Sequence, residues 1–375
     1  MTVTVKHMME VMEVIAPAKF AESWDNVGLH MGHPDWQVQT IWVALDPTPQ
    51  VIKEACHNQV NMLITHHPFF FKPIQAIQLN KPQGELINRA LTHRLAIFCA
   101  HTNLDSVNDG LNDLMAKKIG FTPTRALKTT HSNELYKLVF YVPKSHEKTV
   151  LNALCETPAG TIGHYHSCSF RHEGIGSYIP DSQAKPFIGK TWDLTHVDEI
   201  RVETVIQKQH ISKTLSIIQN VHPYETMAYD IYPLYSFDNQ CIGLGRVGKL
   251  SESLSLLELA QQVKKQFNCS NIRCIGNPDM KIQTIAICSG SGASLIPEFL
   301  SSGADVYITG DLKYHDAQNI EDNKRACLDI GHFSSERIMV DFVVNQLRTA
   351  CTKNQWRINI NACPDLLEKD PFITI

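Results

Sequence analysis

The sequence predicts an α/β protein in which two related α/β halves form one core domain, with an α+β domain inserted between them. Three observations support this fold class. A strand-helix-strand pattern near the N-terminus returns near the C-terminus, and a second pattern returns in the same order. The segment between the two halves follows a different succession of strands and helices, which is typical of a separate domain.

The first half contains a βαβ unit. "TIWVAL" (Thr40 to Leu45) is a short β-rich run, "TPQVIKEACHNQ" has helical spacing, and "VNMLIT" (Val60 to Thr65) is a buried-strand run. Two adjacent histidines, His66 and His67, follow the second strand.

The same unit recurs in "TIAICSGSGASLIPEFLSSGADVYITGD" (Thr284 to Asp311), as strand, glycine-rich turn, helix and strand. Three pairs of residues match at one constant offset: Ile41 with Ile285, Ile64 with Ile308, and Thr65 with Thr309. "ITHH" therefore falls on "ITGD", and we infer an internal repeat.

A second correspondence supports the repeat. "LAIFCAHTNLD" (Leu95 to Asp105) and "ACLDIGHFSSE" (Ala326 to Glu336) are each an apolar strand, a small residue and then His-x-x-x-carboxylate. In parallel α/β sheets, ligands collect beyond the carboxyl ends of the strands. The candidate site residues that follow such strands are His66, His67, His101, Asp105, Asp311, His332 and Glu336.

The middle of the chain reads differently, from about Leu135 to Leu234. It contains strand "LYKLVFYVP", helix "HEKTVLNALCET", strands "YHSCSFRH" and "IRVETVIQ", helix "ISKTLSIIQNV" and strand "MAYDIYPL". This β-α-β-β-α-β order is a split βαβ, ferredoxin-like unit. We therefore predict a first core half at 1–134, an inserted domain at 135–234 and a second core half at 235–375.

Composition and charge bear on the expected partners and location. The net charge of −4 and the sequence pI near 6.5 give no electrostatic reason to expect nucleic acid or an anionic membrane as partner. The eleven cysteines contain no C-x-x-C pair and are interpreted as reduced thiols. No signal-peptide pattern and no membrane-spanning run of about 20 apolar residues is present, so a cytoplasmic location is expected.

The pair His66-His67 allows two interpretations. One histidine could be buried and hydrogen-bonded while the other is solvated. Alternatively, because adjacent side chains diverge at a strand end, the two imidazoles could reach two metal ions a few ångströms apart. Histidine together with carboxylates suits zinc, manganese or iron.

The remaining candidates also have structural alternatives. Asp105 could be a metal ligand or the N-cap of the helix "SVNDGLNDLMAKK", and His101 a ligand or a donor behind the ligands. His332 and Glu336 are four residues apart and can face one point, although Glu336 could instead be a capping-box acid.

Two glycine-rich motifs and one loop complete the list. "GLGRVG" (Gly243 to Gly248) matches G-x-G-x-x-G without the βαβ context of a dinucleotide site. "SGSGAS" (Ser289 to Ser294) could hold an anion or be a tight strand-helix turn. "ESWDNVGL" (Glu22 to Leu29) is predicted to be a loop with Asp25-Asn26 as turn formers and Trp24 as an apolar anchor.

Together, these motifs resemble those of the Nif-three-like (NGG-interacting factor three-like) dinuclear metal-centre family, also catalogued as GTP cyclohydrolase I type 2 homologs. The resemblance is carried by "SWDNVGL", "ITHHPFFF", "HTNLDS", "GLGRVG", "SGSGAS", "YITGDLKYHDA" and "GHFSSE". The segment with "HPYETMAYDIYPL" (His222 to Leu234) resembles the CutA/PII-like insertion of the family's long form.

The resemblance implies two divalent metal ions per chain, with Glu336 as the bridge between them. The ligands it implies are His66, His67, Asp105, His332 and Glu336. It also implies a toroidal homohexamer whose metal sites face an internal cavity. The catalogue name suggests GTP ring opening.

The leading hypothesis is a metal-dependent hydrolase acting on GTP or another phosphorylated small molecule. His101 or His315 could then move the proton. In the repeat, Asp311 stands at the position equivalent to His67, so it is expected to face the same cavity. One alternative is a non-catalytic or regulatory hexameric assembly that senses a small ligand through its PII-like domain. Another is an adaptor that binds proteins. Metal-dependent turnover separates the first hypothesis from the other two.

Overall fold

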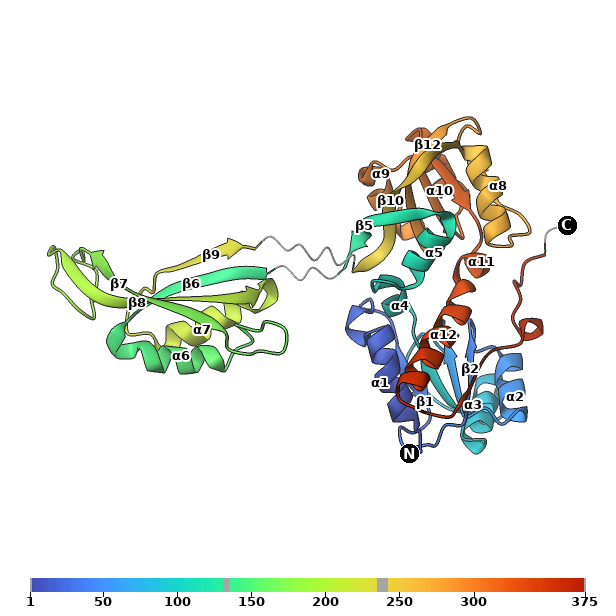
Figure 1. Cartoon of the computed structure of the whole chain (residues 1–375), viewed down its shortest axis with the longest axis horizontal. Coiled ribbons are helices and arrows are strands. Elements are labelled where there is room, and N and C mark those ends of the chain that lie inside the picture. The colour runs from blue at the N-terminus through green and yellow to red at the C-terminus, as the bar shows by residue number, and fades with distance from the viewer. Residues whose placement is uncertain (1, 131–134, 235–241, 374–375) are drawn as a thin grey trace. The chain divides into compact units, whose positions relative to one another are not determined.

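The computed structural model describes residues 2–130, 135–234 and 242–373. The chain forms two compact units, which are Met1–His131 with Gln240–Ile375, and Ser132–Asn239. Both units are drawn in Figure 1, with their elements labelled. Within the described ranges, no helix has the length and apolar character needed to cross a membrane.

The first sheet of the core unit has the order β1-β4-β3-β2-β15. Its strands are β1 (Gly28–Met31), β2 (Thr40–Ala44), β3 (Met62–Thr65), β4 (Ala96–Cys99) and β15 (Asn359–Ala362). All neighbours are parallel except β1, which pairs antiparallel with β4. Side chains alternate between its two faces, so that Ile41 and Val43 join one apolar cluster while Trp42 and Ala44 join another.

Helices cover both faces of this sheet. Helices α1 (Val5–Ile15) and α12 (Ile338–Lys353) contribute to the cluster on one face, and α2 (Pro49–His57) and α3 (Pro82–Thr92) to the cluster on the other. The result is a three-layer α/β/α arrangement with strands buried on both sides.

The second sheet has the order β11-β14-β13-β12-β10-β5. Its strands are β5 (Phe121–Thr129), β10 (Gly243–Ser255), β11 (Arg273–Ile275), β12 (Lys281–Ser291), β13 (Val306–Gly310) and β14 (Ala326–Asp329). One face packs against α5 (Leu111–Ile119) and α8 (Leu256–Gln266), and the other against α9 (Ile296–Ser302) and α10 (Tyr314–Asp322).

The short elements of the core unit complete the chain path. They are α4 (Thr102–Ser106), α11 (His332–Glu336), η1 (Ala18–Phe20), η4 (Ala293–Leu295) and η5 (Asp365–Leu367). Helices α4 and α11 each follow the third parallel strand of their sheet, β4 and β14 respectively.

The two sheets repeat one design. The parallel strands β2, β3 and β4 correspond to β12, β13 and β14, and an antiparallel strand, β1 or β11, lies beyond the third. Asn61 accepts hydrogen bonds from the backbone amides of residues 39 and 40, and Asp305 accepts them from residues 283 and 284. These pairs share the offset that relates Ile41 to Ile285, so the repeat extends to individual hydrogen bonds.

The match of "LAIFCAHTNLD" with "ACLDIGHFSSE", which aligns His101 with His332, is wrong by one residue. Ala100 donates its amide to the carbonyl of Thr65, and Ile330 donates to that of Thr309, which fixes the alignment of the third strands. Two residues later α4 begins at Thr102 and α11 at His332. His332 therefore corresponds to Thr102 in the fold, and His101 occupies the position before the helix.

The inserted unit has one antiparallel sheet in the order β7-β8-β6-β9. Its elements are β6 (Leu135–Pro143), η2 (Lys144–His146), α6 (Glu147–Cys155), β7 (Ser169–Tyr178), β8 (Thr195–Gln207), η3 (Lys208–His210), α7 (Ile211–Val221) and β9 (Tyr229–Pro233). Helices α6 and α7 pack against one face of the sheet, as the predicted β-α-β-β-α-β order requires.

The predicted position of β7 needs correction. The expected strand "YHSCSFRH" covers residues 165–172, whereas β7 runs over Ser169–Tyr178. Gly174 and Gly176 interrupt the β-rich composition of its second half, so the sequence pattern ends before the strand does.

Candidate metal centre

Two histidines at the end of β3 present one nitrogen each to a shared centre. The Nδ1 of His66 donates to the carbonyl of Ala100 at 3.0 Å, and that of His67 donates to Oδ1 of Asp46 at 2.8 Å. Their ring centroids lie 5.2 Å apart with the planes inclined by 56°. Because Nδ1 is occupied in both rings, Nε2 of each is the atom left to bind a ligand.

Helix α11 brings His332 and Glu336 to the same centre. The Nδ1 of His332 donates to Oδ2 of Asp311 at 2.7 Å, and its Nε2 lies 3.0 Å from Oε2 of Glu336. The same Oε2 lies 3.0 Å from Nε2 of His67, and Oε1 lies 3.5 Å from Nε2 of His66. The buried Glu336 carboxylate therefore contacts three histidines and caps no helix.

Asp105 approaches the centre from α4. Its Oδ1 accepts a hydrogen bond from the hydroxyl of Ser289 at 2.8 Å and lies 3.9 Å from Nε2 of His66. Burial raises the pKa of the Asp105 carboxyl above its usual value. The alternative role as a helix cap is wrong, because the N-cap of α5 is Gly110.

His101 lies beside this centre and is held by a residue that sequence analysis treated as a turn former. The Nδ1 of His101 donates to Oδ1 of Asp25 at 2.9 Å, while Thr102 donates its amide to Oδ2 at 3.1 Å. Burial alone would raise the pKa of Asp25, but the hydrogen bonds from His101 and Thr102 hold it at about 2. Trp24 is not the expected apolar anchor, because it is 62 % exposed and contacts His101 edge-on.

Two overlapping groups of side chains could each hold a metal ion. His66, His67 and His101 form one group, and His67, His332 and Glu336 form the other, with ligand atoms within 4.8 Å of one another in each. Among the described residues, Nε2 of the fully buried His66 has no hydrogen-bond partner. A buried, unpartnered imidazole nitrogen beside carboxylates is the donor set that a divalent metal requires.

A glycine keeps this space open. Gly290, in "SGSGAS", has φ +60°, and a Cβ there would lie 2.1 Å from Oε1 of Glu336 and 3.1 Å from Nε2 of His332. Any side chain at this position would enter the centre. The motif thus joins the end of β12 to η4, and glycine is needed in it next to Glu336.

The metal-free cluster retains protons. Burial lowers the pKa of His67, but hydrogen bonds to Asp46 and Glu336 raise it to about 10. For His332, burial likewise lowers the pKa, while Glu336 and Asp311 raise it to about 9. Burial opposes ionisation of Glu336, yet the neighbouring histidines hold its pKa well below the usual value.

Two further candidates, His315 and the "GLGRVG" motif, do not take part in the cluster. His315 is exposed in α10, where its Nδ1 pairs with Gln318 at 3.0 Å, and it is outside both groups of potential ligands in the described chain. "GLGRVG" lies within β10, where the buried Arg246 donates to Asp113 at 2.8 and 2.7 Å, so the motif is not a dinucleotide turn.

Sequence reasoning missed three polar residues that orient the cluster: Asp25, Asp46 and Ser289. Asp46 had a usable signal, because it directly follows the predicted strand Thr40 to Leu45. Asp25 had no such local signal in the sequence, because its partners Thr102 and His101 lie more than seventy positions away.

Comparison with known proteins identifies relatives along nearly the whole chain. Residues 3–365 match the family model described as Duf34/NIF3 (NGG1p interacting factor 3). A Bacillus subtilis protein named "GTP cyclohydrolase 1 type 2 homolog" is 37 % identical over 355 residues, which is 95 % of each chain.

Solved structures agree with this result. A Bacillus cereus protein related to NIF3 is 33 % identical and matches over the whole of both chains with a TM-score of 0.71. A Staphylococcus aureus protein is 28 % identical, with a TM-score of 0.76 over 100 % of this chain and 99 % of the other. The chain therefore belongs to the Duf34/NIF3 (NGG1p interacting factor 3) family.

Proposed function

We propose that the cluster binds two divalent metal ions, of zinc, iron or manganese. The ligands in this proposal are His66, His67, Asp105, His332 and Glu336. The observation that carries it is the orientation of the histidines, because the Nδ1 of each ligand histidine donates to a fixed oxygen while its Nε2 is left to face Glu336. Such partners behind a ligand fix its tautomer and ring orientation.

Two ions are favoured over one by the contacts of Glu336. Its Oε1 is nearest to His66, and its Oε2 is shared by His67 and His332. The two oxygens of one carboxylate thus meet different histidines, as a bridging ligand would.

We further propose that the centre is that of a hydrolase acting on a nucleotide or a related phosphorylated small molecule. Two divalent ions would supply Lewis acidity, which lowers the pKa of water and polarises a substrate oxygen or ring carbon. The relatives' name, "GTP cyclohydrolase 1 type 2 homolog", makes GTP the first substrate to test.

His101 is the residue proposed to move the proton. Its Nδ1 is held by Asp25, and its ring lies 5.2 Å from that of His66 and 5.6 Å from that of His67. Asp311 acts by orienting His332. His315, exposed on α10, is the weaker candidate for proton transfer.

Metal analysis of the purified chain tests the site. His66→Ala and Glu336→Ala should each lower bound metal per chain to less than half of the wild-type value, because each removes a central donor. His315→Ala is the matched control and should keep full metal content. Unchanged content in both ligand variants would show that the metal site is elsewhere.

Turnover tests the reaction. The metal-loaded chain is incubated with GTP and a panel of phosphorylated metabolites, and hydrolysis should require metal and fall steeply in His101→Ala while metal content is kept. A metal-loaded protein that consumes none of these compounds would favour the non-catalytic alternative.

A hexameric assembly is part of the proposal. Trp24 and Phe71 are 62 % and 59 % exposed beside His101, and contact with a second copy would remove such apolar surface from water. Light scattering should give about six times the chain mass of 42.3 kDa. A monomeric mass would contradict it.

The second candidate function is that of a ligand sensor, with the insertion as a CutA/PII-like domain that binds a small molecule. The cavity described in the next subsection favours this candidate.

A further inference from the structure

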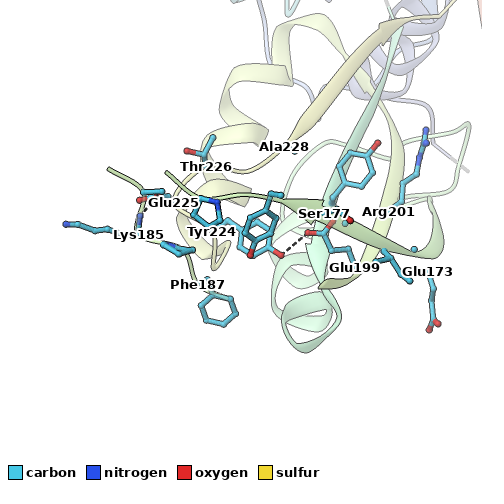
Figure 2. Close-up of a pocket in the computed structure, with 18 of the residues that line it drawn as sticks. Glu173, Ser177, Lys185, Phe187, Glu199, Arg201, Tyr224, Glu225, Thr226 and Ala228 are labelled. Carbon is cyan, nitrogen blue, oxygen red and sulfur yellow. Dashed lines mark hydrogen bonds between the residues drawn. The ribbon is translucent and has the colours of Figure 1, made fainter. Parts of the chain in front are cut away.

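The inserted unit contains a cavity of about 580 Å³ on the face of its sheet opposite to α6 and α7 (Figure 2). Tyr141, Glu199 and Arg201 form part of its floor, on the face that alternates with the buried Ile200 and Val202. The segments that follow β7 and precede β9 form its walls. Cavities of this volume hold small molecules.

Aromatic rings line this cavity. The ring of Tyr224 lies 6.1 Å from that of Tyr178 and 6.4 Å from that of Phe187, edge-on to the first and tilted to the second. Phe187 is 48 % exposed, so apolar surface at the cavity is not covered by the chain itself.

A carboxylate of the lining contacts one of these rings. Oε1 of Glu199 accepts a hydrogen bond from the hydroxyl of Tyr224 at 2.8 Å (Figure 2). Its Oε2 lies above β7, where a Cβ on Gly176 would approach it to 2.2 Å. The glycine thus leaves the room that this carboxylate occupies.

The positive groups of the lining are directed elsewhere. The Nε of Arg201 lies 3.0 Å from Oε1 of Glu203, and its guanidinium is stacked over Tyr141 at 6.0 Å. Figure 2 shows the side chains of Arg201 and Lys185 extending away from Glu199. Glu225 also lines the cavity, whereas the Glu173 carboxylate pairs with Lys144 at 2.8 Å on the other face of the sheet.

We propose that this cavity binds a small organic cation with a flat apolar body, whose positive group meets Glu199 beside the rings of Tyr178 and Tyr224. Aromatic faces and a carboxylate both attract a cation, and the rings accept a flat apolar body. The site is independent of the proposed metal centre, because the two are built from different units of the chain.

The structure offers a way to block the cavity without disturbing the fold. A Cβ on Gly174 would meet nothing within 4 Å, and Gly174 pairs directly with Glu199 on the same face of the sheet. Gly174→Leu therefore places a side chain in open space within the cavity.

Three compounds of one shape test the charge that the site prefers. They are 4-aminobenzamidine, a cation, 4-aminobenzamide, which is neutral, and 4-aminobenzoate, an anion. Calorimetric titration of the full chain should show one cation bound per chain, about tenfold or more tighter than either analogue. Equal or tighter binding of the anion, or no binding of the cation at millimolar concentration, would overturn the proposal.

Variants place the binding in this cavity. Glu199→Gln keeps the acceptor for Tyr224 and should weaken the cation about tenfold or more. Asp198→Asn, an exposed neighbour outside the lining, is the control and should leave affinity unchanged. Gly174→Leu should abolish binding with an unchanged circular dichroism spectrum, and His66→Ala should bind normally. Full affinity in Glu199→Gln or Gly174→Leu would assign the cation to another site.

Discussion

At the scale of single residues, the cluster depends on oxygens that hold the histidines from behind. In three of the four imidazole rings, Nδ1 donates a hydrogen bond to a carboxylate. These carboxylates belong to Asp46, Asp311 and Asp25. The fourth ring, that of His66, donates to a backbone carbonyl. Asp25 also receives the amide and hydroxyl of Thr102, so it joins the loop before β1 to α4.

Asp25→Asn should lower the free energy of unfolding of the metal-free protein by about 2 kcal/mol at neutral pH. The estimate follows from the fall of the Asp25 pKa from 3.8 to about 2 and the complete burial of its side chain. A carboxyl with a lowered pKa stabilises the fold above 3.8, and this contribution is lost as pH falls toward 2. Urea unfolding across that range measures the difference.

The control for this variant is Asp35→Asn, because the Asp35 side chain is 81 % exposed beside His33. Its unfolding free energy should stay close to the wild-type value at every pH. A difference between Asp25→Asn and wild type that persists unchanged at pH 2 would mean that packing, not charge, is responsible.

Metal uptake should depend on pH above the usual range of histidine. In the metal-free chain His67 has a pKa of about 10 and His332 of about 9, and a metal must displace these protons. Zinc affinity, measured by competition with a chelator, should therefore keep rising between pH 6.5 and 9. Asp311→Asn removes one cause of the raised His332 pKa and should make the rise less steep near pH 9, while His67 keeps it from ending. A plateau just above pH 6.5 in the wild type would contradict this account.

At the scale of elements, the sequence predicts the parallel strands well because they are runs of buried, mostly apolar residues. β3 ends at Thr65, where "VNMLIT" ends, and α7 has the bounds of "ISKTLSIIQNV". The strand-end rule also brings together six of the seven predicted polar residues around one centre, and Asp311 joins through His332.

The parts that sequence missed depend on long-range contacts. Asp25 is defined by a hydrogen bond to a residue 76 positions away, which no local pattern contains. The one-residue shift between His101 and His332 depends on the register of the strands, which two matching His-x-x-x-carboxylate motifs do not reveal.

The carboxyl end of β12 gives a further prediction. Gly290→Ala should lower metal content sharply, because its Cβ would lie 2.1 Å from Oε1 of Glu336. Gly303→Ala is the matched control, since Gly303 also has positive φ, +82°, but a Cβ there meets nothing within 4 Å. Both variants carry a backbone strain of about 1 kcal/mol, so equal metal content in the two would show that the space beside Glu336 is not needed.

At the scale of the whole molecule, the inserted unit enters the core at the end of one pair of strands. β5 ends at Thr129 and β10 begins at Gly243, and these two residues are direct partners in an antiparallel pair. Partners of this kind lie about 5 Å apart. The inserted unit therefore stands where a hairpin turn between β5 and β10 would be.

Replacing residues 131–241 by Asn-Gly should leave a folded, metal-binding core. Thr130 and Ile242 would then flank a two-residue turn between β5 and β10. Such a turn requires positive φ at both residues, which Asn-Gly adopts readily. Both apolar clusters of each core sheet are built from residues outside the deleted range, so their packing is retained. Circular dichroism, metal analysis and titration with 4-aminobenzamidine measure the result, and only binding of the cation should be lost. A core that folds but no longer binds metal would show that the metal centre needs the inserted unit. A core that still binds the cation would show that the cation site lies outside the inserted unit.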